Sequence, residues 1–196
     1  MSKFTTNLPQ SQTKRLPAGL LPGDLSVELF GLRESRKVFA ISNGNTIPFK
    51  KIPQEIKAII LERMLSDVIA KEDLSCLSHD EALEEYAFCL YGAADSAPDF
   101  TPEGKAGAPE NFVCGVNCRC LQWQTKQVTI NGNRLTPHEV RVINMLTSDR
   151  PDKQVAAELS IAPATLDTHK NNIYKKAGVQ SKAGLATLAF NQHVIY

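Results

Sequence analysis

The feature that most constrains the fold of this chain is a complete helix start at residues 135–140, in the C-terminal third. Thr136 is a preferred N-cap residue, Pro137 suits the first helical position, and Glu139 completes a capping box. These side chains satisfy backbone N–H groups that the first turn of a helix leaves without partners. A helix is therefore predicted from Pro137 to the stretch 148–151, which ends it.

Three further helices are predicted to follow. The apolar spacing predicts a short helix over residues 152–159, a tight connection over 160–162, and a longer helix from 163 to about 177, where Gly178 supplies the stop. A fourth helix is expected from about 181 through 190. Two helices joined by a three-residue turn form a helix-turn-helix, and the second of them lies in the major groove of DNA.

Residues 132–196 resemble the helix-turn-helix domain of the LuxR-type (NarL/GerE) family. The resemblance is specific, because residue identity and spacing agree across four predicted helices without a gap. It implies a sequence-specific DNA-binding transcription regulator that acts as a homodimer on double-stranded DNA. The matching residues are Leu135-Thr136-x-x-Glu139, Val155-Ala156, Leu159-x-Ile161, Thr165-Leu166-x-x-His169, Asn172-Ile173-Tyr174-x-Lys176-x-Gly178-Val179, Ser181-Lys182 and Leu185.

The resemblance also implies three groups of site residues. The base-reading residues on the recognition helix, about 163–177, would be Asp167, Thr168 and Asn171. The residues near DNA phosphates would be Lys153, Thr165, Lys170 and Lys175. The dimer contacts, in the fourth helix, would be Leu185 and Leu188.

Two other functions remain open at this point. A sigma-factor-like promoter-binding module shares the Leu-Thr-x-x-Glu start, and it would make RNA polymerase a partner. The Asn-Ile-Tyr-x-Lys run at 172–176 favours the LuxR type instead. The second alternative is a structural or protein-docking protein held together by a cysteine-based metal staple.

The charge balance separates the chain into two parts. The whole chain has 22 Lys+Arg against 21 Asp+Glu, but residues 130–196 carry 8 Lys+Arg against 5 Asp+Glu. Only this C-terminal part is expected to meet a polyanion. No apolar run is long enough to cross a bilayer, so we expect a cytoplasmic protein without membrane contact.

Catalysis is not expected. The common nucleotide-binding, hydrolase and metalloprotease motifs do not occur in the sequence, so the chain is predicted not to be an enzyme. The carboxylates Asp95, Asp99 and Glu103 fall in a Gly/Pro-rich stretch, where such groups are expected to be solvated.

The N-terminal part is predicted to be a small α+β unit, residues 24–120, that regulates, oligomerises or docks a partner. An Asn-Gly turn at 43–44 between two apolar runs predicts a hairpin, whose second strand contains Pro48 and so lies at an edge. Helices are expected over 53–70 and from the capping box that starts at Ser78.

The overall fold class is therefore mostly α: a small α+β N-terminal unit, with a hairpin and two helices, precedes a four-helix LuxR-type domain at 132–196. Residues 1–23 are expected to form a flexible arm, and residues 92–111 a Gly/Pro-rich linker or long loop. Alternating βα units are not evident before residue 130, so a phosphoacceptor receiver domain is disfavoured.

Five cysteines complete the set of candidate residues. Three of them, Cys114, Cys118 and Cys120, lie within seven residues and could hold Zn²⁺ if a fourth ligand joined them. A redox-responsive thiol and ordinary buried or free thiols are the alternatives. Cys89 lies at the edge of a helix stripe, where core packing is its expected role. The candidates for the fourth ligand are Cys76, His79 and Cys89.

Overall fold

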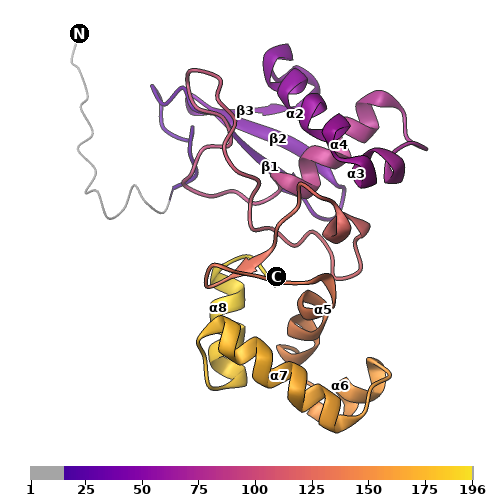
Figure 1. Ribbon diagram of the computed structural model, residues 1–196. Helices are drawn as coiled ribbons and strands as arrows, with labels where there is room; N and C mark the ends of the chain where they lie inside the picture. Colours follow the sequence, from indigo (N-terminus) through magenta and orange to yellow (C-terminus); the bar gives the residue numbers. More distant parts are fainter. Residues whose placement is uncertain (1–15, 196) are drawn as a thin grey trace, which may run out of the picture.

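The computed structural model describes residues 16–195 of the chain (Figure 1). A three-stranded sheet with its helices forms the N-terminal half, and four helices form most of the C-terminal half (Figure 1). The fold class is mostly α with a small N-terminal α+β unit, as predicted. No helix among residues 16–195 is long and apolar enough to cross a membrane.

The predicted hairpin is confirmed and is part of a larger sheet. The strands are antiparallel, in the order β1 (Glu28–Leu32), β2 (Lys37–Ser42) and β3 (Asn45–Pro48). Asn43 and Gly44 connect β2 to β3 with φ values of 50° and 73°, as a type I′ turn requires. Pro48 lies on the edge strand, where its missing N–H is tolerated. The first strand, β1, was not predicted.

Three helices pack beside this sheet, where two were predicted. They are α2 (Gln54–Ser66), α3 (Val68–Asp73) and α4 (His79–Leu90), and a 3-10 turn, η1 (Phe49–Lys51), precedes them. The capping box at the start of α4 is confirmed, since the Ser78 N–H donates to the Glu81 carboxylate at 3.1 Å.

The expectation of one continuous helix over 53–70 is wrong. Asp67 leaves the helical conformation, and its carboxylate accepts a hydrogen bond from the Ala70 N–H at 3.0 Å, which caps α3. The other carboxylate oxygen accepts from the N–H and the hydroxyl of Thr125, at 2.8 and 2.7 Å. The helix therefore breaks where a buried side chain supplies both a new cap and a distant tertiary contact.

The loop 92–111 packs against the N-terminal sheet, so the expectation of solvated carboxylates is wrong for Asp99. Phe100 is fully buried and pairs with Val27 in an isolated antiparallel bridge. Asp99 is buried, and its carboxylate accepts the Leu29 N–H at 2.8 Å. A long loop without regular structure thus belongs to the first core.

The predicted N-terminal arm falls mostly outside the described residues. From residue 16 to 23 the chain packs on its neighbours instead of extending as an arm. Ala18 is buried and its N–H donates to the Asp95 carbonyl at 2.9 Å. The Gly19 carbonyl accepts the N–H of Gly44, at the hairpin turn, at 2.9 Å.

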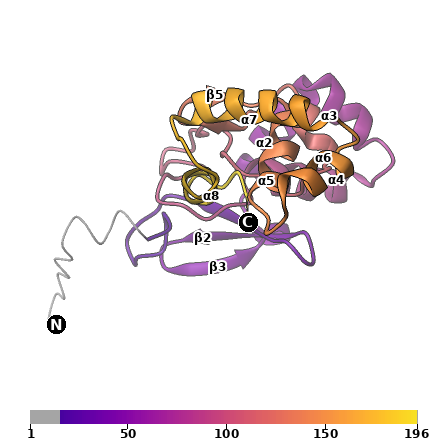
Figure 2. The ribbon, with the colours of Figure 1, turned by 90° about the horizontal axis from the view of Figure 1, so that it is seen from below.

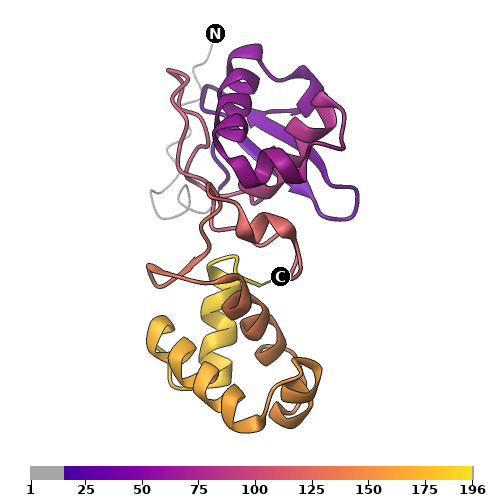
Figure 3. The same cartoon turned by 45° about the vertical axis from the view of Figure 1, so that its right-hand side comes forward.

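The C-terminal half follows the predicted series of elements closely. A hairpin of β4 (Thr129–Ile130) and β5 (Asn133–Arg134) leads into the helices. These are α5 (Pro137–Leu146), α6 (Asp152–Glu158), α7 (Pro163–Ala177) and α8 (Lys182–Asn191). The capping box of Thr136 and Glu139 and the left-handed Gly178 stop are both present. Figures 1 and 3 place α6 and α7 at the end of the molecule far from the N-terminal sheet.

The described residues contain two hydrophobic cores, one in each half of the molecule. The connecting segment, residues 112–128, contributes side chains to both cores. Phe112 packs in the N-terminal core, whereas its neighbour Val113 packs in the C-terminal core. The chain then returns to the first core in the 3-10 turn η2 (Arg119–Gln122) and at Trp123. This connecting segment is therefore held by both halves of the molecule.

Candidate nucleic-acid interface

The turn between α6 and α7 is built from backbone hydrogen bonds. The Ile161 N–H donates to the Ala156 carbonyl and the Ser160 N–H to the Ala157 carbonyl, both at 3.0 Å. Ser160 has a φ of 56°. Together these features form a Schellman motif, which ends α6 and redirects the chain. The next helix then begins at Pro163, without a side-chain cap from Ala162.

The inner face of α7 fixes its position on the domain. Leu166, Ile173 and Ala177 are buried in the C-terminal core. Near the end of α7, Lys176 pairs with Glu139 of α5 at 2.7 Å. Burial raises the pKa of Glu139, but the hydrogen bond from Lys176 and the backbone bond from Thr136 outweigh it, and the pKa lies below its ordinary value. The capping box therefore positions the Glu139 carboxylate, and its ion pair with Lys176 joins α5 to α7.

The outer face of α7 carries the three predicted base-reading residues. Asp167, Thr168 and Asn171 are all exposed, as are Thr165 and Lys175. Thr168 donates its hydroxyl to the Ala164 carbonyl at 3.0 Å, so the hydroxyl oxygen can still accept a hydrogen bond. Figure 2 shows α7 running along one side of the C-terminal half. The polar side chains of α7 thus lie on an open helix surface.

Lys170 is already engaged with two carboxylates of its own domain. Its ammonium group lies 2.8 Å from Asp152 of α6 and 2.9 Å from Asp167 of α7. The hydrogen bond with Asp152, followed by that with Asp167, raises the pKa of Lys170. Lys153, predicted to lie near phosphates with Lys170, is exposed on α6. The structure therefore leaves Lys153 and Lys175 more accessible than Lys170.

The side chain of Leu185, a predicted dimer contact, is fully buried in the C-terminal core and so presents no surface to a second copy in this structure. Leu188 is partly buried and packs against the same core. The exposed large side chain of α8 is Phe190, at 64% exposure. Phe190 was not among the residues predicted from the sequence. The outward face of α8 depends on how this helix packs on α5 and α7, which the sequence pattern does not specify.

The cysteines that were predicted as metal ligands do come together. Cys114, Cys118 and Cys120 lie with Cys89 in one group whose sulfur atoms are all within 4.8 Å of one another. Cys89 was expected to pack in the core and was also a candidate for the fourth ligand, and the structure places it both in the N-terminal core and in this group. Cys76 is exposed and belongs to no such group among the described residues.

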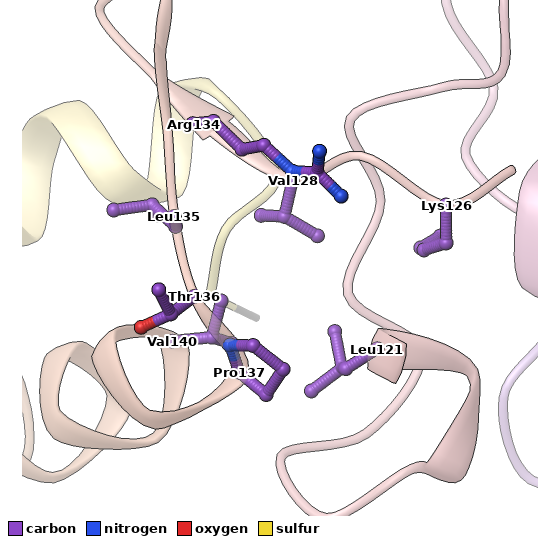
Figure 4. Close-up of a pocket in the computed structure, with 8 residues that line it drawn as sticks. All are labelled: Leu121, Lys126, Val128, Arg134, Leu135, Thr136, Pro137 and Val140. Atoms are coloured by element: carbon purple, nitrogen blue, oxygen red, sulfur yellow. The ribbon is translucent and has the colours of Figure 1, made fainter. Parts of the chain in front are cut away.

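A pocket of about 280 Å³ lies where the connecting segment meets the start of α5 (Figure 4). Leu121 of η2 and Pro137 of α5 lie on opposite sides of it. Its lining includes none of the predicted DNA-contacting residues. The candidate interface is therefore an open surface of α6 and α7 and not a cavity.

Comparison with known proteins agrees with this geometry. Residues 133–189 match the model of the luxR family of bacterial regulatory proteins. The transcriptional regulatory protein MctR of Rhizobium johnstonii is 31% identical over 70 residues, which is 36% of this chain and 33% of MctR. The probable transcriptional regulatory protein NarL of Mycobacterium tuberculosis is 33% identical over 61 residues, 31% of this chain and 28% of NarL.

These matches are confined to one part of each protein. The chain spans about a third of the length of the curated relatives that it matches. No solved structure gave a significant match. The family model covers the hairpin strand β5, the helices α5, α6 and α7, and most of α8. Residues 133–189 therefore form a helix-turn-helix domain of the luxR family of bacterial regulatory proteins.

Proposed function

We propose that this protein is a sequence-specific DNA-binding regulator of transcription, which inserts α7 into the major groove. The observation that carries the proposal is the exposed polar face of α7 on a domain of the luxR family. An α-helix fits the major groove, where each base pair presents a distinct pattern of donors and acceptors. The names of MctR and NarL support the same class of function.

Three exposed residues of α7 are proposed to read base edges. Asn171 suits adenine, since its amide can donate and accept together, and the hydroxyl of Thr168 can pair with several bases. The carboxylate of Asp167 can accept from the amino group of cytosine. Asp167 also repels phosphates, so its presence favours selectivity over general affinity for DNA.

The phosphate contacts are proposed to be few. Lys153 of α6 and Lys175 of α7 are exposed cations beside the reading surface, and Thr165 is exposed at the start of α7. Lys170 would first have to exchange Asp152 or Asp167 for a phosphate. Each neutralised phosphate adds to the salt dependence of binding. We therefore expect a shallower salt dependence than a strongly basic domain would show.

The homodimer is proposed to form through the outer face of α8. Phe190 is exposed there, and Ala183 and Thr187 share its face at helical spacing. Burying an aromatic side chain of this kind against a second copy would stabilise association. In such a dimer the two α7 helices would reach half-sites about one helical turn apart.

The experiment that tests this function maps the DNA that the protein occupies in the cell and then measures binding to one recovered site. We expect purified protein to bind that site at least about 10³-fold more tightly than a shuffled fragment of equal length. Equal affinity for the two fragments at every salt concentration would contradict sequence-specific regulation. Complete absence of salt-dependent duplex binding would favour a docking protein instead.

The sigma-factor-like alternative is separated by the same assay. Such a module would engage its promoter only with RNA polymerase present, whereas the proposed regulator binds the recovered site alone. A site that is occupied only after RNA polymerase is added would therefore overturn the proposal in favour of the alternative.

A further inference from the structure

Four cysteines from two distant parts of the chain meet beside the connecting segment. Cys89 lies in the last turn of α4, and Cys114, Cys118 and Cys120 follow in the segment that leads to the DNA-binding domain. The sulfur of Cys114 lies 3.6 Å from that of Cys89 and 3.2 Å from that of Cys120. All four thiols are free of disulfides.

We propose that these four cysteines bind one tetrahedral Zn²⁺ ion as a structural site. Four thiolates at the usual Zn–S distance of about 2.3 Å lie about 3.8 Å from one another. The observed sulfur separations, from 3.2 Å to within 4.8 Å, lie on both sides of this value. An iron–sulfur cluster would place several irons and sulfides between the thiolates, and so compact a group favours a single ion.

The surroundings of the sulfurs suit thiolates. The Arg36 guanidinium donates to the Cys89 sulfur at 3.5 Å, and it supplies a positive charge beside a site whose four thiolates and one Zn²⁺ sum to −2. Such outer contacts orient metal ligands and stabilise their charge. Core packing alone does not require four sulfurs to share one position.

The site is closed on most sides but remains accessible from one. Cys89 and Cys120 are fully buried and Cys114 nearly so, while Cys118 is partly exposed. Cys118 and Cys120 also line a surface pocket of about 650 Å³. This pocket offers an entry path for the ion, and the full set of four protein ligands leaves no position open for catalysis.

The position of the ion gives it a defined role in the fold. Cys89 belongs to the N-terminal core, and Cys114 directly follows Val113, which packs in the C-terminal core. The Val113 N–H donates to the His193 carbonyl at 3.2 Å, and its carbonyl accepts from Arg33 at 2.8 Å. Zinc would therefore fix the connecting segment to α4 at the point where the DNA-binding domain joins.

Metal content of the purified full-length protein tests the proposal. The protein, prepared under reducing conditions without chelator or affinity tag, should contain about one zinc per chain. Cys89→Ser and Cys118→Ser should each lose the bound zinc, while Cys76→Ser should retain it. Cys118→His should keep the ion, because imidazole replaces thiolate as a zinc ligand and serine does not.

A second measurement requires no variant and so does not depend on their folding. X-ray absorption at the zinc edge of the wild-type protein should show four sulfur ligands at about 2.3 Å. Nitrogen or oxygen ligands, iron with acid-labile sulfide, or failure to take up zinc would each overturn the proposal. A zinc content that Cys89→Ser leaves unchanged would overturn the assignment of the fourth ligand.

Discussion

The ammonium group of Lys170 in α7 lies 2.8 Å from the carboxylate of Asp152 in α6, and this ion pair joins the two helices of the helix-turn-helix. Asp167, one turn earlier in α7, approaches the same ammonium group at 2.9 Å. A cation that the family resemblance assigns to DNA phosphate is therefore shared between two carboxylates of its own domain. The charge on the reading surface is accordingly close to balanced.

Asp167→Asn should raise the affinity for random DNA, because it removes a negative charge beside the phosphates and releases Lys170 from one partner. The slope of log affinity against log salt concentration should steepen by up to about the amount that one additional phosphate contact contributes. Fluorescence anisotropy over a salt series measures both quantities. Asp149→Asn is the matched control, since Asp149 is exposed outside α7. The same effect in both variants would show that the affinity depends only on the net charge of the protein and not on the position of Asp167.

Thr168→Ala and Asn171→Ala should each weaken binding to the preferred site by about 1–3 kcal/mol, with less effect on random DNA, because only base contacts carry sequence information. Lys175→Ala should weaken binding to both DNAs alike, as loss of a phosphate contact does. The measurement is competitive binding with matched site and shuffled fragments. If the three variants lose affinity for both fragments equally, Thr168 and Asn171 do not face the groove floor.

Phe190→Ser should reduce self-association of the protein while leaving its fold intact, because Phe190 is mostly exposed. Leu185→Ala should instead destabilise the domain by about 2–5 kcal/mol, since it opens a cavity in the C-terminal core. Sedimentation velocity reports association, and urea unfolding reports stability. If Phe190→Ser leaves the self-association of the protein unchanged, the outer face of α8 is not the dimer interface.

Three buried carboxyl groups should make stability fall as pH rises. Burial raises the pKa of Glu28 to about 8, of Asp99 to about 9 and of Glu110 to about 10. The folded state keeps these protons after the unfolded chain, whose carboxyls have pKa values near 4, has released them. The contribution of these three groups to the free energy of unfolding is therefore complete below pH 4. It is lost progressively as the pH rises to about 10.

Glu110→Gln should remove one of these contributions. Its Oε2 accepts the Ala93 N–H at 2.7 Å, which the amide oxygen of Gln can still do, and its Oε1 has no hydrogen-bond partner among the described residues. As the pH rises above about 5, the variant should become progressively more stable than the wild type, by of order 1 kcal/mol per pH unit. Urea unfolding from pH 5 to 9 measures this, with exposed Glu103→Gln as control. A gain that does not vary with pH would contradict the raised pKa.

Local signals predicted the helices of the C-terminal half. The capping box of Thr136 and Glu139 and the stop at Gly178 involve residues close together in the chain, so their meaning does not depend on the rest of the fold. The break at Asp67 could not be predicted in this way. Its carboxylate is held by Thr125, which lies 58 positions further along the chain.

The sequence by itself determined the family of residues 133–189, the order of the four C-terminal helices and the hairpin at Asn43-Gly44, because each depends on neighbouring residues. Only the tertiary structure decided that Phe190 is the large apolar side chain that α8 exposes. It also decided that Cys89 joins the cysteines of the connecting segment. Burial and long-range contact depend on how the helices and the connecting segment pack, and a local pattern does not contain that information.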